Sequence, residues 1–281
     1  SFMRKLFEYS QLNCGFIQHH RNVVSFSNYK PISNLVQKRF QDPNAILLAC
    51  MMKSGTRYSL TVLSNYFNLY YQCNYTDQLF KLHKRFFVNL YSEEAQSNSA
   101  VPFCLYENHS FRYNIRELSL FTGKKLISVR NPLDYCCSFS NMVLRENTQS
   151  TSLNSMIRSI ILDFSQTYQQ IRALSKFKEV MIVSAEDLFQ KPENLFKNIL
   201  TFFGCKVDKK ILMEAIKLSS LNTVRNLEKS GHKMLSFTKK SHISNTSIVG
   251  RWKKELSSSQ VTYIENLLSD YDISLDEFIC E

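Results

Sequence analysis

The sequence predicts an α/β fold of three layers, in which a central parallel sheet of about four to five strands is flanked by helices. Short apolar, β-prone runs alternate with longer segments whose apolar residues recur at helical spacing. Continuous apolar strands between helices are typical of a parallel sheet that is covered on both faces. The predicted strands are residues 45–51, 101–106, 125–130 and 179–184.

Helices are predicted between and after these strands, and ligands in such folds bind at the carboxyl ends of the strands. We therefore expect the functional residues just after the apolar runs. No internal repeat or low-complexity linker divides the chain, so we expect a single domain over residues 1–281. The predicted helices are residues 57–72, 76–91, 133–146, 152–176, 193–203, 208–218 and 258–270.

Two segments fit this scheme less well. Residues 70–100 are aromatic and polar, and residues 219–248 are rich in Ser, Thr, Asn and Lys and poor in periodicity. Long segments of this kind are often lids or binding loops, and we expect both to shape a pocket. A plain surface insertion is the alternative interpretation of each.

The net charge of +11 indicates an acidic partner. The basic residues are scattered in pairs, without a long run or a recognised nucleic-acid-binding pattern. We expect no nucleic-acid partner. A solvated basic surface and a pocket for a polyanionic small molecule both remain open as explanations of the charge.

Cysteine usage favours a reducing compartment. The eight cysteines form no C-x-x-C pair, and several lie in apolar runs, which is typical of reduced core thiols rather than of disulfides or a zinc site. We expect no bound metal. The longest apolar stretch, around residues 45–52, is too short to span a bilayer, so we expect a cytoplasmic protein without a membrane partner.

Residues 45–58 carry the strongest functional signal. An apolar run ends in Lys53-Ser54-Gly55-Thr56, and a helical pattern follows. A loop between a strand and a helix directs backbone N–H groups and the positive end of the helix dipole at an anion. The ATP-binding loop has its lysine after the second glycine. Here Lys53 precedes Gly55, and Leu48 stands where the first glycine would fall, so the loop is predicted to bind phosphate but not ATP.

A second anion site is predicted at the end of the 125–130 strand. Arg130 leaves this strand with a planar fork that suits two phosphate oxygens. Ser138, about two helical turns further on, could add a hydroxyl group. As an alternative, Arg130 pairs with Asp134 or caps a neighbouring element.

A third segment, residues 247–254, lies near the C-terminus. Gly250 permits close approach of the backbone to a ligand, and Arg251 adds charge. Trp252, the only tryptophan, by itself suggests a packing anchor as much as a ligand contact.

Together these segments resemble the PAPS-dependent sulfotransferase family, whose fold is of the P-loop-containing nucleotide-binding type. Residues 45–60 are similar to its 5′-phosphosulfate loop and residues 125–146 to its 3′-phosphate motif. The segment 249–253 is similar to its C-terminal G-x-W-K. Further similarity lies in Glu186-Asp187-Leu188, Lys191-Pro192-Glu193 and Phe202-Phe203-Gly204. The departures include Arg57 and Tyr58, where the family has threonine and tryptophan.

The resemblance implies a sulfuryl transfer from PAPS to a hydroxyl or amine of a small-molecule or saccharide acceptor, with release of PAP and without a metal. Lys53 would stabilise the leaving group. Ser54, Gly55 and Thr56 would cradle the 5′-phosphate, with Arg57 and Tyr58 beside them and Tyr58 stacking on adenine. The residues implied for the 3′-phosphate side are Arg130, Ser138, Gly250, Arg251 and Trp252.

A general base should also stand near the sulfur, because the acceptor must lose a proton. The family often places a histidine at the corresponding point, and His109 matches it in kind and place. Glu107 is the rival base. Two other functions stay open at this point: a phosphotransferase on a similar core and, from another class, a basic nucleic-acid-binding protein.

Overall fold

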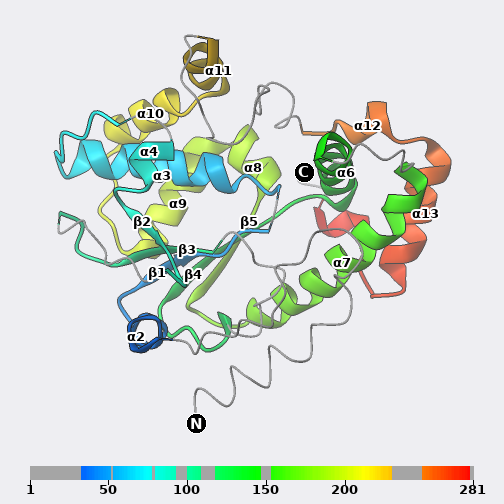
Figure 1. Cartoon of the computed structure of the whole chain (residues 1–281), viewed down its shortest axis with the longest axis horizontal. Helices are drawn as coiled ribbons and strands as arrows, with labels where there is room; N and C mark the ends of the chain where they lie inside the picture. The colour runs from blue at the N-terminus through cyan, green and yellow to red at the C-terminus, as the bar shows by residue number, and fades with distance from the viewer. Residues whose placement is uncertain are drawn as a thin grey trace.

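The structure is a computed structural model that describes residues 33–51, 53–77, 80–92, 100–108, 118–146, 153–229 and 249–278. Its centre is a five-stranded sheet with the strand order β2-β3-β1-β4-β5, in which every neighbouring pair is parallel (Figure 1). The predicted fold class is confirmed. The strands are β1 (Ile46–Leu48), β2 (Phe87–Asn89), β3 (Leu105–Glu107), β4 (Lys124–Val129) and β5 (Val180–Ser184).

Alternate residues of the central strands point to two separate hydrophobic cores. Ile46 and Leu48 of β1 belong to one core, and Leu47 belongs to the other, as do Ile127 and Val129 of β4. This alternation follows from the two-residue period of a strand. Because both faces are apolar, helices must cover both, as the continuous apolar runs predict.

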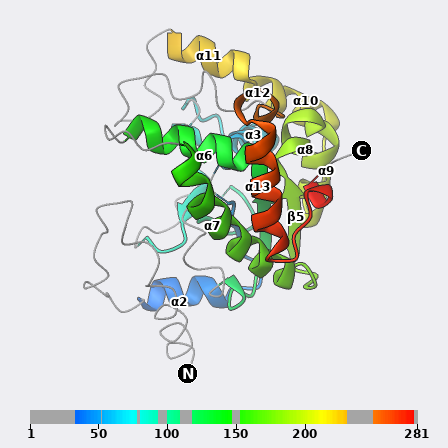
Figure 2. The same ribbon diagram turned by 90° about the vertical axis from the view of Figure 1, so that its right-hand side faces the viewer.

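The first core lies under α3 (Thr56–Tyr70), α4 (Phe80–His83), α8 (Ala185–Gln190), α9 (Pro192–Phe203) and α10 (Lys209–Leu218). The second lies under α2 (Asn34–Gln41), α6 (Pro132–Glu146), α7 (Leu153–Leu174), α13 (Ser258–Ser269) and the 3-10 helix η2 (Leu275–Phe278). Two further helices are α11 (Leu221–Lys229) and α12 (Trp252–Glu255). In Figure 2, α13 runs along α7, and α12 lies beside α6.

The prediction of one helix over residues 76–91 is wrong. Helix α4 ends at His83, a turn follows, and Phe87–Asn89 forms the edge strand β2 against β3. Phe87 and Val88 are buried there. Aromatic and β-branched residues favour a strand where a partner strand is available. The periodicity of the segment itself carries no information about that partner.

The segment 219–248 is also more regular at its start than expected. Its first part contains α11, whose polar and apolar residues are strongly segregated. Residues 230–248 lie outside the described part of the chain.

The strand order places the ends of β1 and β4 side by side. From β1 the chain moves toward the β2 edge of the sheet, and from β4 it moves toward the β5 edge. The loops that follow the two strands therefore diverge, which is the arrangement that leaves a crevice at the carboxyl ends of parallel strands. Both predicted anion-binding segments begin at this point.

A buried lysine stands at the opposite end of β4. The Lys125 side chain is buried, and its Nζ donates hydrogen bonds to the carbonyl oxygens of Phe121 and Gly123, at 2.6 and 3.1 Å. Burial lowers the pKa of this amine from 10.5 to about 8, although the charge of Glu179 opposes the shift.

We predict that Lys125 by itself contributes a rise in the free energy of unfolding as the pH increases from about 8 to 10.5, against the fall that buried cysteine and tyrosine side chains with raised pKa values contribute. In this range the unfolded chain holds a proton at Lys125 that the folded chain has released, so higher pH favours the folded state. In urea denaturation across this range, the slope of the free energy of unfolding against pH should be less positive for Lys125→Met than for the wild type. Lys124→Met, at the neighbouring half-buried lysine, is the control and should keep the wild-type slope. An equal slope in Lys125→Met and wild type would contradict the prediction.

Candidate functional site

The loop after β1 has the backbone geometry of an anion-binding turn. Lys53 and Gly55 both have positive φ, at 64° and 86°, and Gly55 is the N-cap residue of α3. A glycine offers no side-chain cap to the first N–H groups of the helix. These N–H groups and the helix dipole therefore point at the space beyond the loop, where an anion is favoured.

Ser54 anchors this loop through hydrogen bonds of its side chain. Its side chain is completely buried, and its hydroxyl group donates to the carbonyl oxygen of Met51. The same oxygen lies 2.6 Å from the hydroxyl oxygen of Ser128 on β4, and Ser128 donates this hydrogen bond because the single Ser54 proton is given to Met51. Ser54 thus ties the loop after β1 to the neighbouring strand.

Arg130 links the two predicted anion sites. Its side chain is buried at the end of β4, and Nη1 donates a hydrogen bond of 2.9 Å to the carbonyl oxygen of Lys53. Burial lowers the pKa of the guanidinium group, and the carboxylates of Asp134 and Glu186 partly offset the shift. The second predicted anion site therefore lies directly beside the first.

Two buried hydroxyl groups near these loops have no oxygen or nitrogen hydrogen-bond partner among the described residues, although the Cys50 thiol lies beside the one on Thr56. They are Oγ1 of Thr56, in the first turn of α3, and Oγ of Ser138, in α6. Buried hydroxyl groups are normally hydrogen-bonded, because leaving one unpaired costs free energy. An anionic ligand that enters from the loops would provide acceptor oxygens for both.

The C-terminal segment is held against the start of α6. The carboxylate of Asp134 accepts hydrogen bonds from the backbone N–H groups of Gly250, at 2.7 Å, and Trp252, at 3.1 Å. Arg251 lies between them, and its Nε donates to Glu255 at 2.7 Å. Sequence-distant residues thus meet at the second predicted anion site. The Trp252 ring packs against the second core.

Glu107, Arg57 and Tyr58 lie around the loop on its other side. Glu107 ends β3, and burial raises the pKa of its carboxyl group, while the charges of Lys84 and Arg57 oppose the shift. The Tyr58 ring stacks on Phe189, with ring centres 5.3 Å apart, and burial raises its pKa to about 12. The other predicted base, His109, lies outside the described residues.

Some residues of the site were not singled out from the sequence. Ser128 forms a hydrogen bond with Ser54, and the charge of Lys84 lowers the pKa of Glu107, against the larger rise that burial causes. Glu186 accepts a 3.2 Å hydrogen bond from the backbone N–H of Asn131. Ser128 left one signal, because it is a polar residue inside an apolar strand. Glu186 lies in a segment that resembles the family, but its contact with Asn131 left no sequence signal, and neither did Lys84, since their neighbours come from other parts of the chain.

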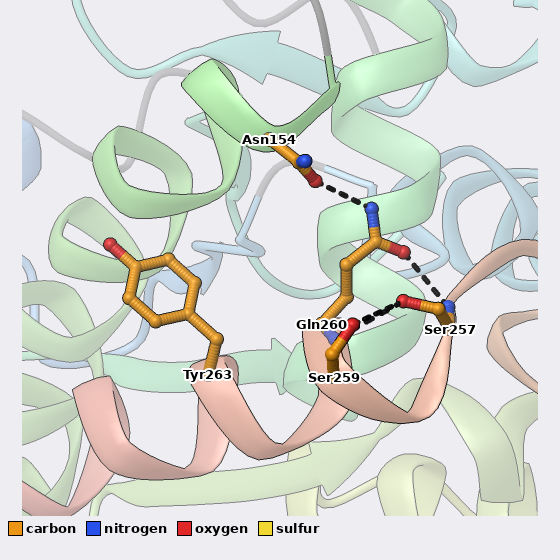
Figure 3. Close-up of a pocket in the computed structure, with 5 residues that line it drawn as sticks. All are labelled: Asn154, Ser257, Ser259, Gln260 and Tyr263. Carbon is orange, nitrogen blue, oxygen red and sulfur yellow. Dashed lines mark hydrogen bonds between the residues drawn. The ribbon is translucent and has the colours of Figure 1, made fainter.

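A hollow of about 320 Å³ lies elsewhere, between the starts of α7 and α13 (Figure 3). None of the predicted site residues lines it. Its polar side chains bond to one another: Gln260 donates to Asn154 at 2.7 Å, and its amide oxygen accepts from the backbone N–H of Ser257. Ser257 and Gln260 form the capping box of α13, so these groups serve the start of the helix.

The described part of the chain contains no group of three or more His, Cys, Asp or Glu side chains that could hold a metal ion. No described helix combines the length and the apolar character that a membrane crossing requires.

The sequence of this chain matches one protein-family model over most of its length. The family model for the sulfotransferase domain matches residues 43–270, a range that contains both anion-binding loops and the C-terminal segment. This chain belongs to the sulfotransferase domain family. The match does not favour a phosphotransferase. No curated protein shows a significant sequence match.

Solved structures show the same fold at low sequence identity. A mouse sulfotransferase, SULT7A1, complexed with PAP matches with a TM-score of 0.60 and 14% identity, over 88% of this chain and 95% of that one. Retinol dehydratase with retinol and PAP matches with a TM-score of 0.59 and 14% identity, over 85% and 86%. A putative steroid sulphotransferase of Arabidopsis thaliana matches with a TM-score of 0.52 and 16% identity, over 86% of this chain and 81% of that one.

The geometry of the loop after β1 leads to a prediction for Gly55→Ala. A Cβ atom there would lie 3.1 Å from Cδ1 of Leu188, at a φ that side chains disfavour. We expect a loss of about 1–2 kcal/mol of stability and weaker binding of inorganic pyrophosphate, measured by calorimetry.

Gly204→Ala is the matched control for this variant. Gly204 has nearly the same φ, 88°, but it ends α9, and its nearest neighbour would be Nζ of Lys124 at 3.6 Å. It should lose similar stability and keep pyrophosphate binding. Equal pyrophosphate affinities of the two variants would argue against the loop as an anion site.

Proposed function

We propose that this sulfotransferase transfers a sulfuryl group from PAPS to a hydroxyl or amine of a small-molecule or saccharide acceptor and releases PAP. One observation carries the proposal: the two loops predicted to bind anions are joined by the hydrogen bond from Arg130 to the Lys53 carbonyl oxygen. PAPS bears a phosphosulfate at its 5′ position and a phosphate at its 3′ position, and so needs two such sites.

The loop after β1 would hold the 5′ side. PAPS supplies the sulfuryl group as an activated phosphosulfate. The N–H groups at the start of α3, the backbone of Ser54 and Gly55, and the buried Thr56 hydroxyl would bind its phosphate oxygens. Lys53 would neutralise the charge that develops on the leaving phosphate, which is the main electrostatic demand of an in-line transfer. Arg57 would stand at the edge of this site.

The end of β4 would hold the 3′-phosphate. Arg130 offers a buried fork of donors, and the buried Ser138 hydroxyl is aimed at no partner among the described residues. Gly250 and Arg251 would close over the phosphate from the C-terminal segment, with Trp252 anchoring them. Tyr58 would contact the adenine with the part of its ring that Phe189 leaves uncovered.

His109 is the proposed general base, and Glu107 is its rival. Glu107 stands at the carboxyl end of β3, next to the strand that leads into the phosphosulfate loop. Burial raises the pKa of its carboxyl group, which brings it closer to the range useful for proton transfer. His109 follows two residues later and has a suitable ordinary pKa.

Support for a small-molecule acceptor comes from the neighbouring structures. Retinol dehydratase has been solved with retinol and with androsterone, in each case with PAP. We propose that residues 1–281 form one domain and that the segments 70–100 and 219–248 shape the acceptor pocket. A cytoplasmic location remains a prediction that rests on the cysteine pattern.

We predict that PAP binds the wild-type protein and that Arg130→Ala lowers its affinity at least about tenfold. The variant removes a buried charge that pairs with phosphate, and such losses generally exceed 1.4 kcal/mol. Isothermal calorimetry with PAP is the measurement. Arg172→Ala, which removes the same charge at the far end of α7, should leave the affinity unchanged. Absence of PAP binding, or binding unaffected by Arg130→Ala, would overturn the proposed function.

A second prediction concerns the base. His109→Ala should keep the PAP affinity and lose most of the turnover, because it removes a proton acceptor without altering either anion site. Glu107→Gln, which keeps size and hydrogen bonding, should retain most of the turnover. Release of PAP in the presence of PAPS and a phenol or alcohol that the wild type accepts provides the assay. The reverse result would transfer the role of base to Glu107.

A further inference from the structure

Asp134 is a buried carboxylate whose two oxygens both have backbone partners. It lies in the first turn of α6 and is 1% exposed. Oδ2 accepts the N–H of Gly250 and Oδ1 accepts the N–H of Trp252, although these residues are more than a hundred positions away in the sequence. One side chain therefore connects the strand-end loop of β4 to the C-terminal segment.

This connection fixes where Arg251 lies. Arg251 stands between the two residues that Asp134 holds, and its guanidinium is only 10% exposed, in contact with Glu255 at 2.5 Å. Arg251 is close enough to Arg130 for its charge to lower the pKa of that guanidinium. Two arginines brought together in this way repel each other, and an anion near both relieves the repulsion.

Asp134 holds this segment with charge-assisted hydrogen bonds, which are stronger than bonds between neutral groups. The positive end of the α6 dipole also favours a carboxylate at this position. An asparagine of the same shape would accept at one atom only and would present an N–H₂ group to the second backbone N–H. The docking of residues 249–252 therefore depends on the carboxylate itself.

We infer that Asp134 is a positioning residue that docks residues 249–252 over the second anion site and thereby sets the preference for nucleotides that carry a 3′-phosphate. The inference rests on the proposed function, since it takes the ligand of this site to be the 3′-phosphate of PAP. Asp134 acts through Gly250 and Arg251 and does not touch the nucleotide.

The direction in which Asp134→Asn changes the affinity for PAP distinguishes a positioning role from a purely electrostatic one. Asp134→Asn removes a negative charge beside Arg130, so charge alone predicts tighter binding of an anion. Loss of the docked segment predicts weaker binding. A weaker affinity for PAP thus reports the position of Arg251 rather than the charge of Asp134.

The experiment compares PAP with adenosine 5′-phosphate, which lacks the 3′-phosphate. Calorimetry of Asp134→Asn should show PAP affinity reduced about tenfold to a hundredfold, the range for a lost hydrogen bond to a charged group. The affinity for adenosine 5′-phosphate should stay unchanged. Trp252 is the only tryptophan of the chain, so its fluorescence should shift to longer wavelength as the segment leaves α6. Asp208→Asn, at the N-cap of α10, is the control and should alter none of these readouts.

An unchanged ratio of the two affinities in Asp134→Asn would overturn the inference while leaving the proposed function intact. Failure of the wild type to bind PAP would overturn both. Hydrogen exchange of residues 249–252 in the wild type tests the same point without a variant. PAP should slow this exchange more than adenosine 5′-phosphate does, and equal exchange with both nucleotides would contradict the inference.

Discussion

The hydrogen bond from the Arg130 guanidinium to the Lys53 carbonyl oxygen joins the two loops on which the candidate site depends. Lys53 has a φ of 64°, which a residue with a side chain adopts only at some cost in free energy. A buried cation on its carbonyl oxygen offsets part of that cost. The same arginine belongs to the second predicted anion site. The groups that would bind the two ends of one nucleotide are therefore mechanically connected.

The carboxylates around Arg130 offset its charge and also hold the neighbouring backbone in place. Burial alone would disfavour the charged guanidinium, and Asp134 and Glu186 oppose this effect. Each carboxylate also accepts a backbone N–H: Asp134 from the C-terminal segment and Glu186 from Asn131 at the start of α6. The residues that stabilise the cation thus also determine where the neighbouring backbone lies.

The sheet brings a third group to the same edge. β3 lies next to β1 in register, with Glu107 opposite Leu48. Glu107 is close enough to Arg57 of α3 for the two charges to influence each other. The ends of three adjacent strands therefore supply the loop after β1, the arginine and a carboxyl group. This grouping is a consequence of parallel strands, whose carboxyl ends all meet at one edge.

Much of this arrangement is visible in the sequence, because it rests on local patterns. Apolar runs and helical spacing predicted the parallel α/β fold and the location of β1, β4 and β5. The order of Lys53 and Gly55 separated the loop from an ATP-binding loop. The spacing of Arg130 and Ser138 predicted a second anion site. None of these inferences required knowledge of distant contacts.

Other features were decided only by the tertiary structure. Residues 87–89 form a strand because β3 lies beside them, and the sequence pattern alone indicated a helix. Asp134 was an alternative partner for Arg130 in the sequence; in the structure its charge does act on Arg130, and its oxygens also hold Gly250 and Trp252. The sequence by itself determined which residue types follow each strand. Only the folded chain determined their partners, because hydrogen bonds between distant segments depend on where the sheet places the segments that carry them.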